Sequence, residues 1–263
     1  MRPLQTDISV FKKFNFDNPP VGVRYLFHKP GGIEPLDKSL ALCEMLKEAH
    51  QRDAPFYFTK DNENCFGSSA LGMKSDGASP AFAESGELGV KLEIFQDARA
   101  NKRLFQVNPG LAKGTVNYVV MAPLDKITFE PDLLILMTTA KQAEIVLRAM
   151  TYSTGEMYES KTTTALSCSW LYVYPYLTGK MNYFITGMGF GSIGREVFPP
   201  GWVLISIPYN WLPTIVQNLK EMKWELTAYT LGREKFMQWE KGILAELAQE
   251  FKYTQDSLDG IIK

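Results

Sequence analysis

Hydrophobic and polar positions along the chain predict strands and helices in alternation. Residues 21–27 follow two prolines and are rich in β-branched and aromatic side chains, which is typical of a strand. Residues 36–50 place Leu42, Leu46 and Ala49 on one apolar face at helical spacing. By the same criteria we predict strands at 56–59, 116–123, 132–137, 171–176, 182–186 and 202–207, and helices at 95–103, 141–150, 213–219 and 233–251.

This order of elements predicts a single domain over residues 1–263, of the α/β or α+β class, with one mixed sheet and a helical C-terminal extension at 233–251. Residues 178–180 form a plausible hairpin turn between two of the strands. The glycine-rich stretch 72–89 is expected to be a loop with room for a short helix.

The C-terminal helix carries an apolar stripe that must be covered. The stripe consists of Phe236, Trp239, Ile243 and Leu247. Packing against the same chain is the simpler expectation, and a homodimer is the alternative.

Composition and charge narrow the possible partners. The chain has 263 residues, with 28 Lys and Arg against 29 Asp and Glu, so its formal net charge is −1. Balanced charge argues against duplex nucleic acid and against a polybasic membrane anchor. Residues 1–17 lack an apolar signal core, and no apolar run approaches the ~20 residues that span a bilayer. We therefore expect a cytoplasmic protein with neither nucleic acid nor membrane as a partner.

Gly189, Gly191 and Gly194 spell G-x-G-x-x-G after the strand predicted at 182–186. A dinucleotide-binding turn must open a long helix, but here the chain runs into two prolines within a few residues, which argues against that cofactor. A tight turn between strands is the simplest interpretation. Alternatively, the loop binds an anion through its backbone N–H groups with Arg195 beside it, and Arg24 as a second cation.

The chain has only two histidines, His28 and His50, which argues against a typical zinc hydrolase site. His50 lies at the C-terminal end of a predicted helix, where exposed carbonyl groups favour a cation. A solvated capping role is therefore expected for it, in preference to a catalytic one.

Three cysteines, an odd and sparse number, argue against a disulfide framework and for a reducing compartment. Cys43 lies on a predicted helix, with its thiol expected to point inward or toward a cleft. Cys65 opens a Gly-Ser loop whose backbone N–H groups would favour a thiolate. Cys168 enters a predicted strand. From spacing alone, small buried hydrophobic residues are the simplest interpretation.

Several short segments together resemble the domain-of-unknown-function family 169, an uncharacterised group common in anaerobic bacteria and archaea. The resemblance covers residues 20–219 and leaves the C-terminal helix outside. The matching pieces are 20–23, Cys43 with Ala49, 65–67 with 71–72, 131–134 with Gln142, Gly155, Cys168 with Pro175, 187–195 and 207–208.

The resemblance implies that Cys43, Cys65 and Cys168 occupy the family's characteristic cysteine positions and share a metal. Three thiolates without histidine partners favour an iron–sulfur cluster over zinc. A [4Fe–4S] cluster on three cysteines leaves one iron open to a ligand or substrate, which Asp61 or Glu63 could approach. The implied function is redox or enzymatic, with a small molecule or an electron-transfer protein as partner.

Two other functions stay open. One is a thiol-dependent enzyme with Cys65 as nucleophile and another cysteine as its resolving partner. The other is a non-catalytic module that binds a small anionic or aromatic ligand through Arg24, Arg195 and the loop 187–194. Tyr172, Tyr174 and Tyr176 are expected to be the packed face of a strand rather than part of a binding site.

Overall fold

The computed structural model describes residues 1–73 and 85–251. Contacts divide the chain into two compact units, residues 1–222 and 223–263, and each is described by itself. Part of the glycine-rich stretch predicted at 72–89 lies outside the described residues. Its end forms a short helix, α4 (Glu87–Lys91).

Within the described residues, seven strands form one mixed sheet in the order β2-β3-β4-β1-β5-β7-β6. All neighbours pair antiparallel except β2 and β3, which run parallel. The fold class is therefore α/β, as predicted. The strands are β1 (Val21–Leu26), β2 (Glu34–Pro35), β3 (Phe56–Phe58), β4 (Tyr118–Pro123), β5 (Leu133–Thr138), β6 (Asn182–Ile185) and β7 (Val203–Pro208).

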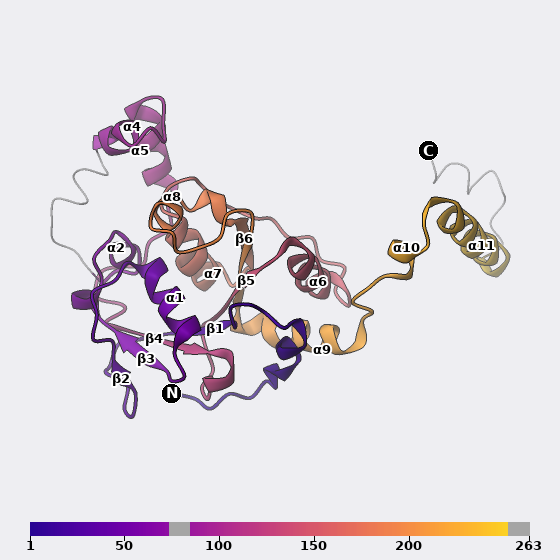
Figure 1. Ribbon diagram of the computed structural model, residues 1–263, viewed down its shortest axis with the longest axis horizontal. Helices are drawn as coiled ribbons and strands as arrows, with labels where there is room; N and C mark the ends of the chain where they lie inside the picture. Colours follow the sequence, from indigo (N-terminus) through magenta and orange to yellow (C-terminus); the bar gives the residue numbers. More distant parts are fainter. Residues whose placement is uncertain (74–84, 252–263) are drawn as a thin grey trace. The chain divides into compact units, whose positions relative to one another are not determined.

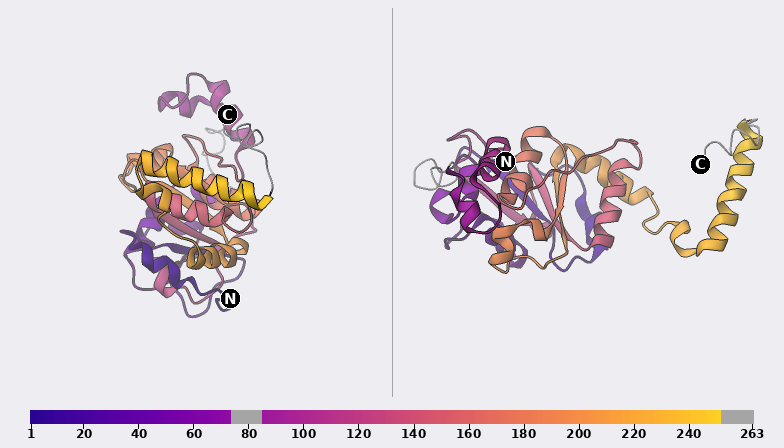
Figure 2. Two further views of the ribbon diagram at one scale, coloured as in Figure 1. Left: turned by 90° about the vertical axis from the view of Figure 1, so that its right-hand side faces the viewer. Right: turned by 90° about the horizontal axis from the view of Figure 1, so that it is seen from above.

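Helices cover both faces of the sheet (Figures 1 and 2). The helix α1 (Leu42–Gln51) packs on β1 and β4, and α7 (Tyr174–Thr178) packs on β7, against a shared hydrophobic core. The helices α6 (Ala140–Thr151) and α9 (Leu212–Glu221) pack on each other, and α6 contacts β5 and β7. The strands β5 and β7 are buried along their whole length, which explains why their sequences are almost entirely apolar.

Both units contain further helical segments. They are the 3₁₀-helices Ile8–Phe14, Lys60–Asn62, Leu124–Lys126, Thr186–Met188 and Tyr209–Trp211, the π-helix Ser169–Val173, α2 (Gly67–Ala70), α5 (Ala98–Val107), α8 (Phe190–Gly194), α10 (Thr227–Thr230) and α11 (Arg233–Phe251). α5 begins after Asp97, whose carboxylate accepts hydrogen bonds from two backbone N–H groups of the first turn.

Two predicted elements differ from the structure. The helix expected at 36–50 begins only at Leu42, because Leu36 donates its N–H to Tyr57 O and residue 40 forms a bridge to the loop at 63. The strand expected at 171–176 is wrong. This segment forms the π-helix and α7 instead, so the hairpin expected at 178–180 is wrong too.

The reason for the second error is burial. Every residue of the π-helix Ser169–Val173 is buried, so its β-branched and aromatic side chains are packed on all sides rather than alternating between two faces. Pro175 then lies in the first turn of α7, where a missing N–H costs nothing.

The second unit contains α10 and α11. The helix α11 begins at Arg233, as predicted, and its apolar stripe includes Trp239, Ile243 and Leu247. Coverage of this stripe by the same chain or by a second copy stays a prediction.

Candidate functional site

A pocket of about 370 Å³ lies beside the core on the α1 side of the sheet. Its lining includes Cys43, Cys65 and Cys168, and we call it the thiol pocket. Three separate segments supply these cysteines: α1, the loop before α2, and the residue that precedes the π-helix. The structure thus brings together three thiols that are far apart in the sequence.

Cys43 is buried on the first turn of α1, with its side chain directed inward, as expected. The close packing of α1 against α2 depends on Gly67. A Cβ atom at that position would lie 2.7 Å from Leu42 Cβ and 3.2 Å from Glu63 Oε1. Only glycine therefore allows the loop that carries Cys65 to approach α1 this closely.

Cys65 is held by a buried carboxylate. Its backbone N–H donates to Glu63 Oε1 at 3.1 Å, and its thiol donates to the same oxygen at 2.6 Å. Gly67 N–H in turn donates to Cys65 Sγ at 3.3 Å. Glu63 is only 2% exposed, whereas Asp61, the other carboxylate considered from the sequence, is exposed; neither of them lines the pocket.

Cys168 starts the π-helix rather than a strand, which corrects its predicted context. π-helical turns are rare and are frequently found at functional sites. One helical turn later lies Tyr172, whose side chain is fully buried and whose hydroxyl has no hydrogen-bond partner among the described residues. Burial raises the pKa of its phenol well above the usual value, and negative charge on the cysteines would raise it further. Tyr172 is packed in the hydrophobic core, as predicted, but in a π-helix rather than on the face of a strand.

Burial raises the pKa values of the thiols. The pKa of Cys43 rises to about 11, and the nearby charge of Arg195 opposes part of the increase. Burial, followed by the Glu63 charge and the thiol hydrogen bond, raises the pKa of Cys65 to about 12. The pKa of Cys168 rises well above its usual value through burial and the neighbouring cysteines. All three are thus neutral thiols near pH 7, and the thiolate expected at Cys65 is wrong for the metal-free protein.

The glycine loop is neither a dinucleotide-binding turn nor a simple tight turn. β6 and β7 are antiparallel, whereas a dinucleotide fold needs parallel strands, and the loop forms the five-residue helix α8. A Cβ atom at Gly189 would lie 2.3 Å from Ser192 Oγ and 3.2 Å from Thr186 O. Gly191 lines the thiol pocket, while Gly189 and Gly194 do not.

The two arginines proposed as anion ligands are separated by the fold. Arg195 follows α8, lines the thiol pocket and donates from Nη1 to Gly191 O at 2.9 Å. Arg24 lies on β1, where its guanidinium pairs with Asp132 at 2.9 Å, and it does not line the pocket. Arg24 is therefore not part of this site, because the half-buried carboxylate of Asp132 already neutralises it.

The opposite wall of the pocket comes from α4 and α5, which sequence analysis did not associate with any site. Leu88, Leu92 and Phe105 line it, together with Phe190 from α8. A further lining residue, Leu166, has φ of 59°, a left-handed conformation that is unusual for leucine. Strained backbone of this kind gathers at ligand sites.

Among residues 1–73 and 85–251, no three His, Cys, Asp or Glu side chains are placed to hold a metal ion as they stand. A single zinc ion needs bonds of about 2.3 Å to every sulfur, whereas an iron–sulfur cluster distributes its cysteine ligands over several irons. The donor set fits the cluster chemically. It has three soft sulfurs in one pocket and a backbone N–H directed at Cys65 Sγ.

Comparison with known proteins places the chain in a family. The family model DUF169, described as "Uncharacterised ArCR", matches residues 11–218. The chain belongs to the DUF169 family. The match includes all three cysteines and Arg195 and ends before the second unit, in agreement with the resemblance found over residues 20–219.

This DUF169 protein is also similar to the uncharacterized protein MJ0308 of Methanocaldococcus jannaschii. The two are 27% identical over 211 residues, which cover 79% of this chain and 89% of the relative. No solved structure matches the chain. In the part of the chain that the structure describes, no helix is both long and apolar enough to cross a membrane.

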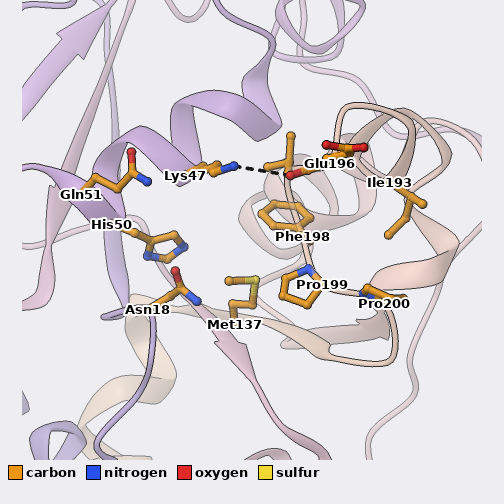
Figure 3. Close-up of a pocket in the computed structure, with 11 residues that line it drawn as sticks. Asn18, Lys47, His50, Gln51, Met137, Ile193, Glu196, Phe198, Pro199 and Pro200 are labelled. Atoms are coloured by element: carbon orange, nitrogen blue, oxygen red, sulfur yellow. Dashed lines mark hydrogen bonds between the residues drawn. The ribbon is translucent and has the colours of Figure 1, made fainter.

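The DUF169 chain has a second pocket, of about 490 Å³, which contains His50 (Figure 3). Lys47 reaches across it and donates to Glu196 O at 3.4 Å. His50 Nδ1 lies 2.7 Å from Pro19 O and must donate to it, which leaves Nε2 as a buried acceptor without a partner among the described residues. Burial lowers the pKa of His50 to about 4. The prediction that His50 is a solvated, cationic cap of its helix is therefore wrong.

This lowered pKa predicts a pH-dependent stability. Between pH 6.5 and 4 the unfolded chain takes up a proton at residue 50 that the folded protein rejects. Stability is therefore complete above pH 6.5 and falls as the pH drops toward 4, by up to about 3 kcal/mol. Asparagine can keep the hydrogen bond to Pro19 O but does not titrate. The variant His50→Asn should therefore not show the decrease in stability that His50 causes between pH 6.5 and 4.

Urea unfolding of the wild type and of His50→Asn across this pH range measures the difference. His28→Asn is the matched control, because His28 is exposed and its replacement should leave the profile unchanged. Parallel stability curves for the wild type and His50→Asn would show that the buried imidazole does not control acid stability.

Proposed function

We propose that this protein is an iron–sulfur protein, with a [4Fe–4S] cluster held by Cys43, Cys65 and Cys168. The observation that carries the proposal is the convergence of these three thiols on one pocket from three separate segments of the chain. Cysteine is the usual ligand of such clusters. Simple core cysteines have no reason to gather around a shared cavity.

The surrounding residues support such a group. Gly67 N–H donates to Cys65 Sγ, a contact of the kind that tunes clusters by hydrogen bonding to sulfur. The positive charge of Arg195 favours thiolates at Cys43 and Cys168. Ser68 Oγ on α2 is buried and has no partner among the described residues, so it is a further donor available near Cys65.

When bound, the cluster would supply one-electron transfer together with one iron that no cysteine holds. Glu63 is the carboxylate in contact with one of these cysteines, because it accepts a hydrogen bond from the Cys65 thiol in the metal-free protein. Deprotonation of Cys65 on metal binding would remove that hydrogen bond, whereas the donation from Cys65 N–H to the same oxygen would stay. The role that follows is redox or enzymatic.

A thiol-dependent enzyme is less well supported. Such an enzyme needs a lowered thiol pKa and a base, but burial raises all three thiol pKa values. Neither His28 nor His50 lines the thiol pocket. A purely ligand-binding function remains the second candidate, because Arg195 and the apolar wall could hold a small molecule without any cluster.

We further propose a cytoplasmic location and an anaerobic metabolic role, since an open cluster iron requires a reducing compartment. An electron-transfer protein is the expected partner if the reaction is redox. The near-zero net charge continues to argue against nucleic acid.

Anaerobic metal loading tests the proposal. The metal-free protein, incubated with ferrous iron and sulfide and then desalted, should retain about four irons per chain. Zinc alone should be lost on the same column, because the three sulfurs are not placed around a single ion. Stoichiometric zinc retention without iron–sulfur uptake would contradict the cluster and indicate a mononuclear site.

A further inference from the structure

The thiol pocket contains one charged side chain in a mostly apolar lining. Of the described residues that line it, Arg195 alone carries a charge. Its side chain is exposed, its Nη1 donates to Gly191 O, and no carboxylate within residues 1–73 and 85–251 forms an ion pair with it. A guanidinium that is oriented by its own loop and has N–H groups left over is suited to a carboxylate, which it can bind in a two-pronged geometry.

The rest of the lining indicates the other half of the ligand. Leu88, Leu92, Ile94, Phe105 and Phe190 form apolar walls. Two of these side chains remain well exposed, Leu92 at 42% and Phe190 at 41%. Exposed large apolar side chains that face a pocket of about 370 Å³ are typical of a site for a small molecule.

We propose that the thiol pocket binds a small amphipathic monocarboxylate, with its carboxylate on Arg195 and its apolar body between α4, α5 and α8. One basic group matches one negative charge, which disfavours di- and triphosphates and dicarboxylates. The ligand lies beside the three cysteines, so it is also the substrate class for the open iron. That last statement rests on the proposed function, whereas binding of the carboxylate itself does not.

Calorimetric titration with naphthylacetate and its neutral amide, naphthylacetamide, tests the charge requirement. The two probes share an apolar body and differ only in the anionic group. The wild type should bind the carboxylate at least about tenfold more tightly than the amide. Arg195→Gln should lower carboxylate affinity about tenfold and leave amide affinity unchanged, since only the charged contact is lost.

Two further variants keep the result interpretable. Arg103→Gln alters an exposed arginine on α5 outside the pocket and should change neither affinity. Phe190→Ala should lower the affinity for both probes equally, because it removes only an apolar contact. Equal affinity of the wild type for carboxylate and amide, or an Arg195→Gln variant that binds naphthylacetate normally, would overturn the proposal.

The titrations are carried out on both metal-free and iron-loaded protein, which separates this inference from the cluster. Selective carboxylate binding by a chain that takes up no iron supports the ligand class and refutes the cluster. Iron uptake without carboxylate selectivity leaves the cluster standing and refutes the ligand class.

Discussion

Replacing Cys65 with serine is expected to reduce the iron content of anaerobically loaded protein from about four atoms per chain to less than one. Serine is nearly isosteric, but its hydroxyl is a hard, weakly acidic ligand that does not replace a soft thiolate on iron. The cluster would have three protein ligands instead of the usual four, so the loss of one cysteine should prevent cluster binding. Cys43→Ser and Cys168→Ser should show the same loss.

Iron analysis is paired with a check of folding. Ser167→Ala is the matched control, because Ser167 also lines the thiol pocket beside Cys168 but offers no thiolate, and this variant should keep its iron. Thermal melting of each metal-free variant shows whether the fold survives. A folded Cys65→Ser protein with a full complement of iron would exclude Cys65 as a ligand.

Replacing Asp132 with alanine is expected to lower the free energy of unfolding by about 3 kcal/mol. Asp132 precedes β5 and accepts hydrogen bonds from Tyr25 N–H at 2.6 Å and from Arg24 Nη1 at 2.9 Å. Alanine leaves both donors on β1 without these acceptors. The effect also reaches the site, since Tyr25 donates its hydroxyl proton to Tyr172 O within the π-helix.

Burial raises the pKa of Asp132 in spite of these two contacts. Charge attraction to Arg24 is therefore not the main source of stability, and the hydrogen bonds matter more. Asp132→Asn keeps one acceptor and should cost about half as much as the alanine variant.

Urea unfolding at pH 7 measures both Asp132 variants. Asp125→Ala serves as the control. Asp125 forms an exposed ion pair with Lys12, and its loss should change stability by less than about 0.5 kcal/mol. Equal losses for Asp132→Ala and Asp132→Asn would contradict the account that the hydrogen bonds, rather than the charge, hold β1 and β5 together.

The central strands could be predicted because their local pattern and their environment agree. β5 is an uninterrupted apolar run and is buried throughout, and β1 is rich in β-branched residues beside two prolines. The strand prediction for residues 171–176 was wrong because the same residue types are buried in a π-helix, where tertiary packing overrides β propensity. The predicted start of α1 was wrong because residues 36–41 form backbone hydrogen bonds to neighbouring segments, which helical periodicity does not reveal.

The candidate site was less accessible to sequence reasoning. The inward direction of Cys43 follows from its position on α1, and Glu63 was noted for its closeness to Cys65. The convergence with Cys168 depends on contacts between distant segments, and only the family resemblance suggested it. Arg24 was wrongly assigned to the site because its ion-pair partner, Asp132, is distant in the sequence. Nothing local indicated that α4 and α5 form a wall of the pocket.

Iron and sulfide analysis of the full chain purified without oxygen, together with its electron paramagnetic resonance spectrum after reduction, tests the central claim most directly. The account predicts a brown protein with about four irons and about four sulfides per chain and a cluster signal on reduction. A colourless protein that stays free of iron even after reconstitution would contradict it.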